Sequence, residues 1–355
     1  MSTIRNSSLR TPVHTRKTWI MISFFIVITI AGLTYVKWAP YYHKAMSAAD
    51  THSIGSSILN GFHADDTVSV WQSAATYAMT YFKAVWKAAL LGMIVGSMIQ
   101  MLLPANWLLK LLGRASFKST LIGGASSLPG MMCSCCAAPI ASGMRKQQVS
   151  VGASLAFWMG NPLLNPATLI FMTFVLSWKF TILRLVFGIV ITFGISYLAN
   201  RFAKPDNKTD ELISNHLPSV EADNRPLWSR WITSFGRMLI QVIPAYLISV
   251  FILGILQSFM FPEWLNAGFA AIIFFAIAGT FFVIPTAAEI PIIQSFLSFG
   301  ISSGASAALL ITLPAISLPS LLLVSRAFPQ KVLVFVTSSV IVLGIICGCV
   351  GVLWL

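Results

Sequence analysis

Three cysteines stand close together in the stretch PGMMCSCCAAP, which runs from Pro129 to Pro139. Cys133 and Cys136 share a face if the stretch is helical, whereas Cys133 and Cys135 share a face if it is extended. Thiolates are soft ligands that select soft metal and metalloid ions. Either conformation offers two thiols to one thiophilic atom, and the third thiol could take it next, so all three are candidate metal ligands. The alternative is that three small side chains only permit close packing of helices.

One carboxylate, Glu289, lies inside an apolar segment, two residues before Pro291. A charge within a membrane is costly and indicates a functional site. If the protein is a transporter, we expect Glu289 to carry the proton that drives transport or to orient the transported substrate. Alternatively, it could cap backbone N–H groups freed by a broken helix. Five further polar residues are expected to line one cavity with the cysteines and Glu289, or to satisfy freed backbone groups. They are Ser134, Asn161, Asn165, Thr286 and Ser317.

The composition places these residues in a membrane. The chain of 355 residues is 57% hydrophobic and 9% charged, whereas a soluble domain carries about 25% charged residues. Apolar runs approach the ~20 residues that a helix needs to span a bilayer. They lie at about 18–36, 84–103, 185–200, 238–259 and 332–355, and only Lys87 in the second is charged. The first run is too long for a cleaved signal peptide and predicts a retained helix. The chain is therefore predicted to be an all-α integral membrane protein.

The net charge of +13 does not indicate nucleic-acid binding, because the basic residues cluster between the apolar runs. There they orient the protein in the bilayer. The basic tail, with Arg5, Arg10, Arg16 and Lys17, predicts a cytoplasmic N-terminus.

The chain contains an internal repeat at an offset of 152 residues (291 − 139 = 152). Pro139 matches Pro291 and Pro162 matches Pro314, and Gly-Ala-Ser recurs at 152–154 and 304–306. We predict a first permease repeat at 72–202 and a second at 230–355. Residues 1–71 would form a tail, one transmembrane helix and an external loop, and 203–229 a cytoplasmic linker. The basic residues give the two repeats opposite orientations, as in secondary transporters.

Prolines interrupt four apolar segments. Segments 117–147 and 267–299 predict two re-entrant hairpins, and 149–178 and 302–325 predict two broken transmembrane helices. The expected breaks are at Pro129, Pro139, Pro162, Pro166, Pro285, Pro291, Pro314 and Pro319. Freed backbone groups cannot face lipid and require protein or a watery cavity around them. The interrupted segments therefore predict a binding site near the midplane.

The stretch LPGMMCSCCAAPIASGMRKQQVSVGASLAFWMGNPLLNPATL resembles the bacterial predicted permeases that include the trivalent organoarsenical efflux permeases. The shared features are a cysteine-containing core before a proline, a downstream Gly-Ala-x-x-Ala-Phe and a Pro-rich Asn-Pro-x-x-Asn-Pro. The resemblance covers about residues 72–355 and implies a multi-pass inner-membrane permease. Arsenical efflux is the best-known activity that it implies.

These observations predict a permease that exports a thiophilic toxicant, foremost trivalent (organo)arsenic, with no enzymatic activity and no resident cofactor. Its expected partners are a small thiophilic substrate and the lipid bilayer, and no nucleic-acid partner is expected. A homo-oligomer is compatible with the sequence. The alternatives are a permease for another soft metal ion or for a sulfur or selenium compound, and a thiol-based membrane redox protein.

Overall fold

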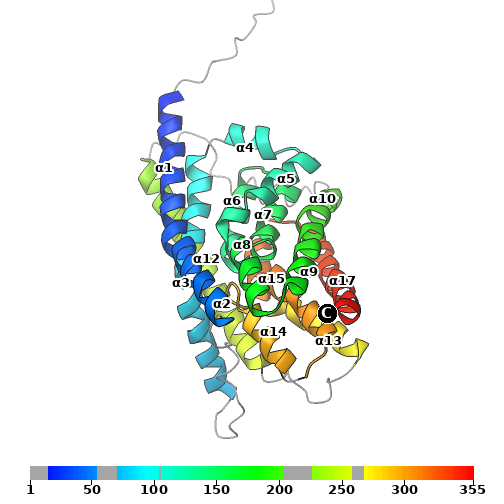
Figure 1. Ribbon diagram of the computed structural model, residues 1–355. Helices are drawn as coiled ribbons and strands as arrows, with labels where there is room; N and C mark the ends of the chain where they lie inside the picture. The colour runs from blue at the N-terminus through cyan, green and yellow to red at the C-terminus, as the bar shows by residue number, and fades with distance from the viewer. Residues whose placement is uncertain (1–14, 54–69, 104, 204–225, 258–267, 299) are drawn as a thin grey trace, which may run out of the picture.

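The computed structural model describes residues 15–53, 70–103, 105–203, 226–257, 268–298 and 300–355. Within these ranges the chain forms helices and contains no β-strand (Figure 1). The helix at the N-terminus consists of α1 (Thr15–Leu33), the π-helical segment η1 (Thr34–Trp38) and α2 (Ala39–Thr51). The predicted tail, most of the predicted linker and part of the predicted external loop lie outside the described residues.

The first half contains α3 (Val70–Leu102), α4 (Ala105–Leu112), α5 (Phe117–Ala125), η3 (Leu128–Gly130), α6 (Ser134–Lys146), α7 (Val151–Leu163), α8 (Pro166–Val175), α9 (Trp178–Ile189), η4 (Val190–Ile195), α10 (Ser196–Ala199) and η5 (Asn200–Phe202). The second half contains α12 (Leu227–Gln257), α13 (Phe269–Phe281), α14 (Glu289–Ser298), α15 (Ser303–Ala315), α16 (Leu318–Val324) and α17 (Gln330–Trp354).

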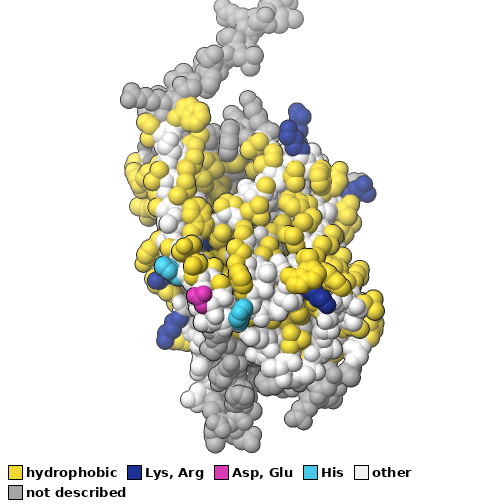
Figure 2. Space-filling model, viewed as in Figure 1, with side chains coloured by type: hydrophobic (Ala, Val, Ile, Leu, Met, Phe, Trp, Pro, Cys, Tyr) yellow, Lys and Arg dark blue, Asp and Glu magenta, His cyan; other side chains and the backbone are white. Residues whose placement is uncertain are grey.

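Six helical stretches within the described residues are long and apolar enough to cross a membrane. They are Trp19–Thr51, Ala75–Leu102, Trp178–Phe202, Trp228–Ile255, Ser303–Val324 and Gln330–Trp354. Large apolar side chains are exposed on them, and hydrophobic residues cover much of the face in Figure 2. An exposed surface of this kind is stable in lipid rather than in water, and it confirms the all-α integral membrane protein. The first helix continues to Thr51, beyond the predicted end at residue 36.

The two interrupted segments predicted as hairpins each return toward the end at which they began. In the first, α5 and α6 run in opposite directions. Ser119 Oγ, near the start of α5, therefore lies 3.2 Å from Ser150 Oγ, which follows the end of α6. In the second, α13 and α14 are joined by the non-helical residues 282–288, and the rings of Phe275 and Phe296 lie 5.5 Å apart. The tip residues Met132, Cys133, Val283 and Ile284 are buried, so both tips lie inside the protein.

Most of the predicted prolines stand at chain breaks, but Pro139 does not. Pro129 and Pro285 lie in the non-α tips, and Pro162 and Pro314 lie one residue before α7 and α15 end. Pro166, Pro291 and Pro319 occupy first turns, where the missing N–H has no intrahelical acceptor.

The predicted break at Pro139 is wrong, because α6 continues through this residue. A proline inside a helix removes one hydrogen bond and is tolerated where packing compensates. Here α3 approaches through Gly92 and Gly96, a Gly-x-x-x-Gly pair. A Cβ at Gly96 would lie 2.8 Å from Pro139 O, so the two backbones are in close contact.

Helices α6 and α14 begin 155 residues apart (289 − 134), and four other pairs of corresponding helices begin 152 residues apart. The pairs are α5 and α13 (269 − 117), α7 and α15 (303 − 151), α8 and α16 (318 − 166), and α9 and α17 (330 − 178). Ser150 and Ser302 also cap α7 and α15 in the same way, each accepting from the backbone N–H three residues later. The helix positions thus follow the same spacing as the sequence repeat.

The paired long helices run in opposite directions. The ring of Trp178, at the start of α9, lies 6.1 Å from that of Trp354, at the end of α17, while Phe202 stacks on Phe335 at 4.3 Å. Helices α3 and α12 are likewise antiparallel, because Trp231 Nε1 donates to Ser97 Oγ at 3.1 Å while Trp71 stacks on Phe251. Inverted halves would produce this arrangement, although the domain boundaries themselves stay a prediction.

Candidate functional site

The tips of both hairpins and the ends of both broken helices meet at one small cavity of about 10 Å³. That is about the space that one water molecule needs. Its lining residues are Cys133, Ser134, Pro162, Ile284, Pro285, Thr286, Glu289 and Pro314. The structure therefore brings together four of the predicted polar or thiol site residues, namely Cys133, Ser134, Thr286 and Glu289. Three predicted break residues, Pro162, Pro285 and Pro314, also line it, whereas Cys135, Cys136, Asn161, Asn165 and Ser317 are not among its lining residues.

The three thiols separate into a pair and a single residue. Cys133 Sγ lies 2.7 Å from Cys136 Sγ, because α6 begins at Ser134 and residues three apart share a helical face. Cys135 Sγ instead lies 3.1 Å from Ser317 Oγ. No group of three or more His, Cys, Asp or Glu side chains in the described chain could hold a metal ion. The geometry thus offers two thiols, rather than three, to one soft atom.

Ser317 joins the broken helix of the second half to the tip of the first hairpin. Its hydroxyl lies 3.3 Å from Ser134 Oγ, in addition to its contact with Cys135. Ser317 also begins α16, where it forms a reciprocal capping box with Ser320. The side chain therefore has both a capping role and a contact with α6.

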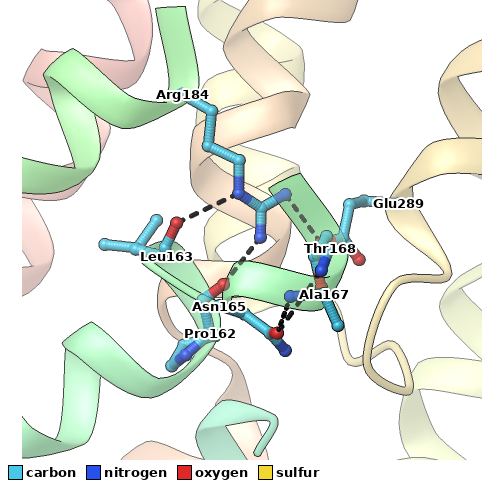
Figure 3. A network of polar contacts seen from close by, with 7 residues as sticks. All are labelled: Pro162, Leu163, Asn165, Ala167, Thr168, Arg184 and Glu289. Atoms are coloured by element: carbon cyan, nitrogen blue, oxygen red, sulfur yellow. Dashed lines mark hydrogen bonds and ion pairs between the residues drawn. The ribbon is translucent and has the colours of Figure 1, made fainter. Parts of the chain in front are cut away.

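Glu289 forms a buried ion pair with Arg184, which the sequence prediction missed. Arg184 Nη1 lies 2.7 Å from Glu289 Oε1, and the two side chains are 0% and 2% exposed. The same guanidinium donates from Nη2 to Pro162 O at 2.6 Å and from Nε to Leu163 O at 3.2 Å (Figure 3). One arginine on α9 therefore satisfies the broken end of α7 and neutralises a carboxylate on α14.

The second oxygen of Glu289, Oε2, is buried and has no hydrogen-bond partner among the described residues. A buried unsatisfied acceptor is costly, and Glu289 lines the cavity. A hydrogen-bond donor in the cavity would relieve that cost. The sequence could have indicated Arg184 as a site residue, because its charge stands directly before the predicted apolar run at 185–200. The structure extends that helix back to Trp178, so Arg184 lies within the membrane-spanning stretch.

The two asparagines satisfy backbone groups at breaks. Asn165 Oδ1 accepts from the backbone N–H groups of Ala167 and Thr168, and so caps α8. Asn161 Oδ1 accepts from Met132 N at 3.4 Å, and Asn161 Nδ2 donates to a carbonyl of its own helix. Structural satisfaction, one of the two roles expected for them, therefore accounts for their contacts.

Long side chains from distant helices satisfy the carbonyls freed at the hairpin tips. Trp158 Nε1 donates to Ser134 O at 2.8 Å, and Tyr77 OH donates to Val283 O at 2.6 Å. Trp38 Nε1 donates to Pro129 O at 2.9 Å. These bonds explain how irregular backbone persists inside a membrane protein, where each unsatisfied group costs several kcal/mol.

A multi-pass helical membrane protein whose broken segments converge on one buried polar point has the architecture of a membrane permease. The comparisons with known proteins agree. Residues 119–352 match a family described as predicted permeases, and the chain belongs to that family. Membership supports membrane transport, rather than catalysis, as its function.

Two relatives also match, and the first of them covers nearly the whole chain. The chain is 47% identical over 346 residues to UPF0718 protein YraQ of Escherichia coli (strain K12), covering 97% of each protein. It is 20% identical over 331 residues to UPF0718 protein MJ0584 of Methanocaldococcus jannaschii, covering 74% of this chain and 90% of the relative. No solved structure matches.

Proposed function

We propose that the protein exports a small thiophilic toxicant, foremost trivalent (organo)arsenic, across a bacterial inner membrane, with its N-terminus in the cytoplasm. The observation that carries this proposal is the Cys133–Cys136 thiol pair beside a cavity that is also lined by Glu289, whose Oε2 has no described hydrogen-bond partner. Thiols select soft atoms, and the cavity lies between the broken segments, where transporters bind their cargo.

Two thiols suit transport better than three. A carrier must bind its cargo well enough to load it and weakly enough to release it. Each thiol that binds trivalent arsenic replaces one hydroxyl ligand: the As–O and S–H bonds break, the As–S bond forms, and the thiol proton leaves with the hydroxyl as water. No electrons are transferred, so the exchange is reversible. Water on the opposite side of the membrane can hydrolyse the As–S bond and release the arsenical.

Glu289 is suited to proton coupling in this proposal. Its Oε1 is held by Arg184, whereas its buried Oε2 has no partner among the described residues, and Glu289 lines the cavity. A proton taken up at Oε2 would neutralise the carboxylate and weaken its attraction to Arg184. Glu289→Gln should therefore abolish export that depends on a proton gradient.

Growth of a sensitive host in arsenite, methylarsenite, mercury(II) or copper tests the proposal. We expect the intact gene to protect against trivalent arsenicals and the Cys133→Ser/Cys136→Ser variant to lose that protection. The matched control is Cys347→Ser, which removes a buried thiol of α17 that donates to Ala307 O. Protection that survives loss of the thiol pair would end the soft-ligand proposal, and protection against mercury or copper alone would favour another soft cargo.

The thiol-redox alternative is favoured by one specific observation. Cys133 is the N-cap residue of α6 and Cys136 follows three residues later, so the pair is a Cys-x-x-C arrangement at a helix N-terminus, which promotes thiol reactivity. A redox protein would cycle these thiols through a disulfide during turnover. Export predicts that added cargo protects both thiols from alkylation, whereas redox function predicts loss of both alkylation sites on mild oxidation and their return on reduction.

A further inference from the structure

The N-terminal helix carries a buried lysine on an otherwise lipid-facing element. Its buried residues are Leu33, Lys37, Tyr41 and Ala48, while most of its large apolar side chains are exposed. A spacing of four residues drifts by about 40° per step on a regular helix of ~3.6 residues per turn. The π-helical segment Thr34–Trp38 widens the turn at this place and keeps Lys37 directed inward. Such π-segments are frequent at functional sites.

Lys37 contacts the tip of the second hairpin. Its Nζ donates to Thr286 Oγ1 at 3.1 Å and to Tyr41 OH at 3.1 Å, and it lies 5.1 Å from the centre of the Tyr41 ring. Within the described residues it forms no ion pair with a carboxylate. A buried ammonium without a carboxylate is costly in a membrane and indicates a function.

The contact with Lys37 determines what Thr286 can do in the cavity. A threonine hydroxyl has one donor hydrogen and two acceptor lone pairs. Because Lys37 can only donate, Thr286 Oγ1 accepts from it, and the hydroxyl hydrogen of Thr286 is directed to another acceptor. Thr286 lines the cavity together with Glu289, whose Oε2 has no described partner. The cavity therefore presents one donor, backed by a positive charge, and one acceptor.

We propose that Lys37 is a positioning residue of the transport site, which holds Thr286 as a donor to the hydroxyl group of an uncharged, hydroxylated, thiophilic cargo. That cargo hydroxyl would accept from Thr286 and donate to Glu289 Oε2, while the soft atom exchanges another hydroxyl for the Cys133 thiol with release of water. Methylarsenite carries two hydroxyls, so one remains for this contact after the first exchange, until the Cys136 thiol replaces it as well. This inference rests on the proposed function, and it adds a residue that lies outside the part of the chain matched by the family, 119–352.

The inference is tested by methylarsenite transport into everted membrane vesicles that contain the full chain. We expect Lys37→Met and Thr286→Val each to raise KM about threefold, the effect of one average hydrogen bond in a membrane site. Because both remove the same interaction, the double variant should show the same KM as either single variant. Thr286→Ser keeps the hydroxyl and should keep the wild-type KM.

Trp38→Phe is the matched control for detachment of the helix. It removes the neighbouring hydrogen bond from the same helix to Pro129 O, and we expect an unchanged KM. Effects of Lys37→Met and Thr286→Val that multiply in the double variant, or an equal rise in KM in Trp38→Phe, would overturn the positioning role. If the Lys37→Met protein does not accumulate in the membrane, the Thr286→Val variant is sufficient for the test. A wild-type KM in that variant would overturn the positioning role. A wild-type chain that transports no arsenical refutes the proposed function, and this inference with it.

Discussion

Replacing Arg184 with methionine should destabilise the protein more than any surface substitution, because three partners lose one guanidinium. Arg184 is 0% exposed and contacts Glu289 Oε1, Pro162 O and Leu163 O at 2.7, 2.6 and 3.2 Å. Methionine fills much of the same volume, so the cavity left behind is small. The change is therefore chiefly electrostatic.

The ion pair dominates the expected loss. Removing one partner of a buried pair costs about 3–5 kcal/mol, because the remaining charge is left uncompensated. The two carbonyls contribute less, since hydrogen bonds between helices in a membrane average about 0.6 kcal/mol. We expect Arg184→Met to lower the free energy of unfolding by about 3–5 kcal/mol. Arg184→Met/Glu289→Gln should recover most of it and retain a loss of about 1–2 kcal/mol from the two carbonyls.

Denaturant unfolding in mixed micelles measures these differences. Lys179→Met is the matched control, because Lys179 lies on the same helix but is half-buried and, among the described residues, donates to Trp354 O alone. Its loss should be about 0.5 kcal/mol or less. If Arg184→Met unfolds like the wild type, the ion pair does not hold α9 to α14. If the double variant is as unstable as the single one, the loss does not arise from an uncompensated Glu289.

Three further outcomes follow from the packing. Cys136→Ser should remove cargo protection of Cys133 from alkylation, whereas Cys347→Ser should leave that protection intact, as labelling and mass spectrometry would show. Gly92→Ala places a Cβ against the backbone oxygen of Cys136 and should cost about 1–3 kcal/mol of unfolding free energy, whereas Gly236→Ala, with nothing within 4 Å, should gain about 0.5–1 kcal/mol. Asn165→Ala should cost about 1 kcal/mol through loss of the α8 cap, and an unchanged unfolding midpoint would contradict that role.

The sequence alone predicted the features that depend on near neighbours. Proline positions predicted the hairpin tips and the breaks after α7 and α15, and the three-residue spacing gave the Cys133–Cys136 pair as one of two alternatives, which the helix α6 decides. The same local rule was wrong at Pro139, because the close approach of α3 overrides it. Convergence of Cys133, Ser134, Thr286 and Glu289 on one cavity followed from the repeat, which relates the two hairpins.

The partners of the breaks could not be predicted, because they come from distant parts of the chain. Arg184 lies 105 residues from Glu289, Trp38 lies 91 residues from Pro129, and Tyr77 lies 206 residues from Val283. No local pattern shows which helix faces which break. An ionisable residue in an apolar run was nevertheless a usable signal, and both Arg184 and Lys37 carried it.

The polar contacts around the cavity fall into two kinds that respond differently to a ligand. Those of Trp158, of Tyr77 and of Arg184 with Pro162 end on backbone carbonyls, so breaking one exposes a backbone group that lipid cannot satisfy. Those of Ser134 with Ser317 and of Lys37 with Thr286 join side chain to side chain. A ligand can replace a bond of the second kind at a cost of about 0.6 kcal/mol, the average in membranes, while the backbone stays satisfied. The breaks can thus remain fixed while the side chains between them exchange partners, which is what reversible binding at this cavity requires.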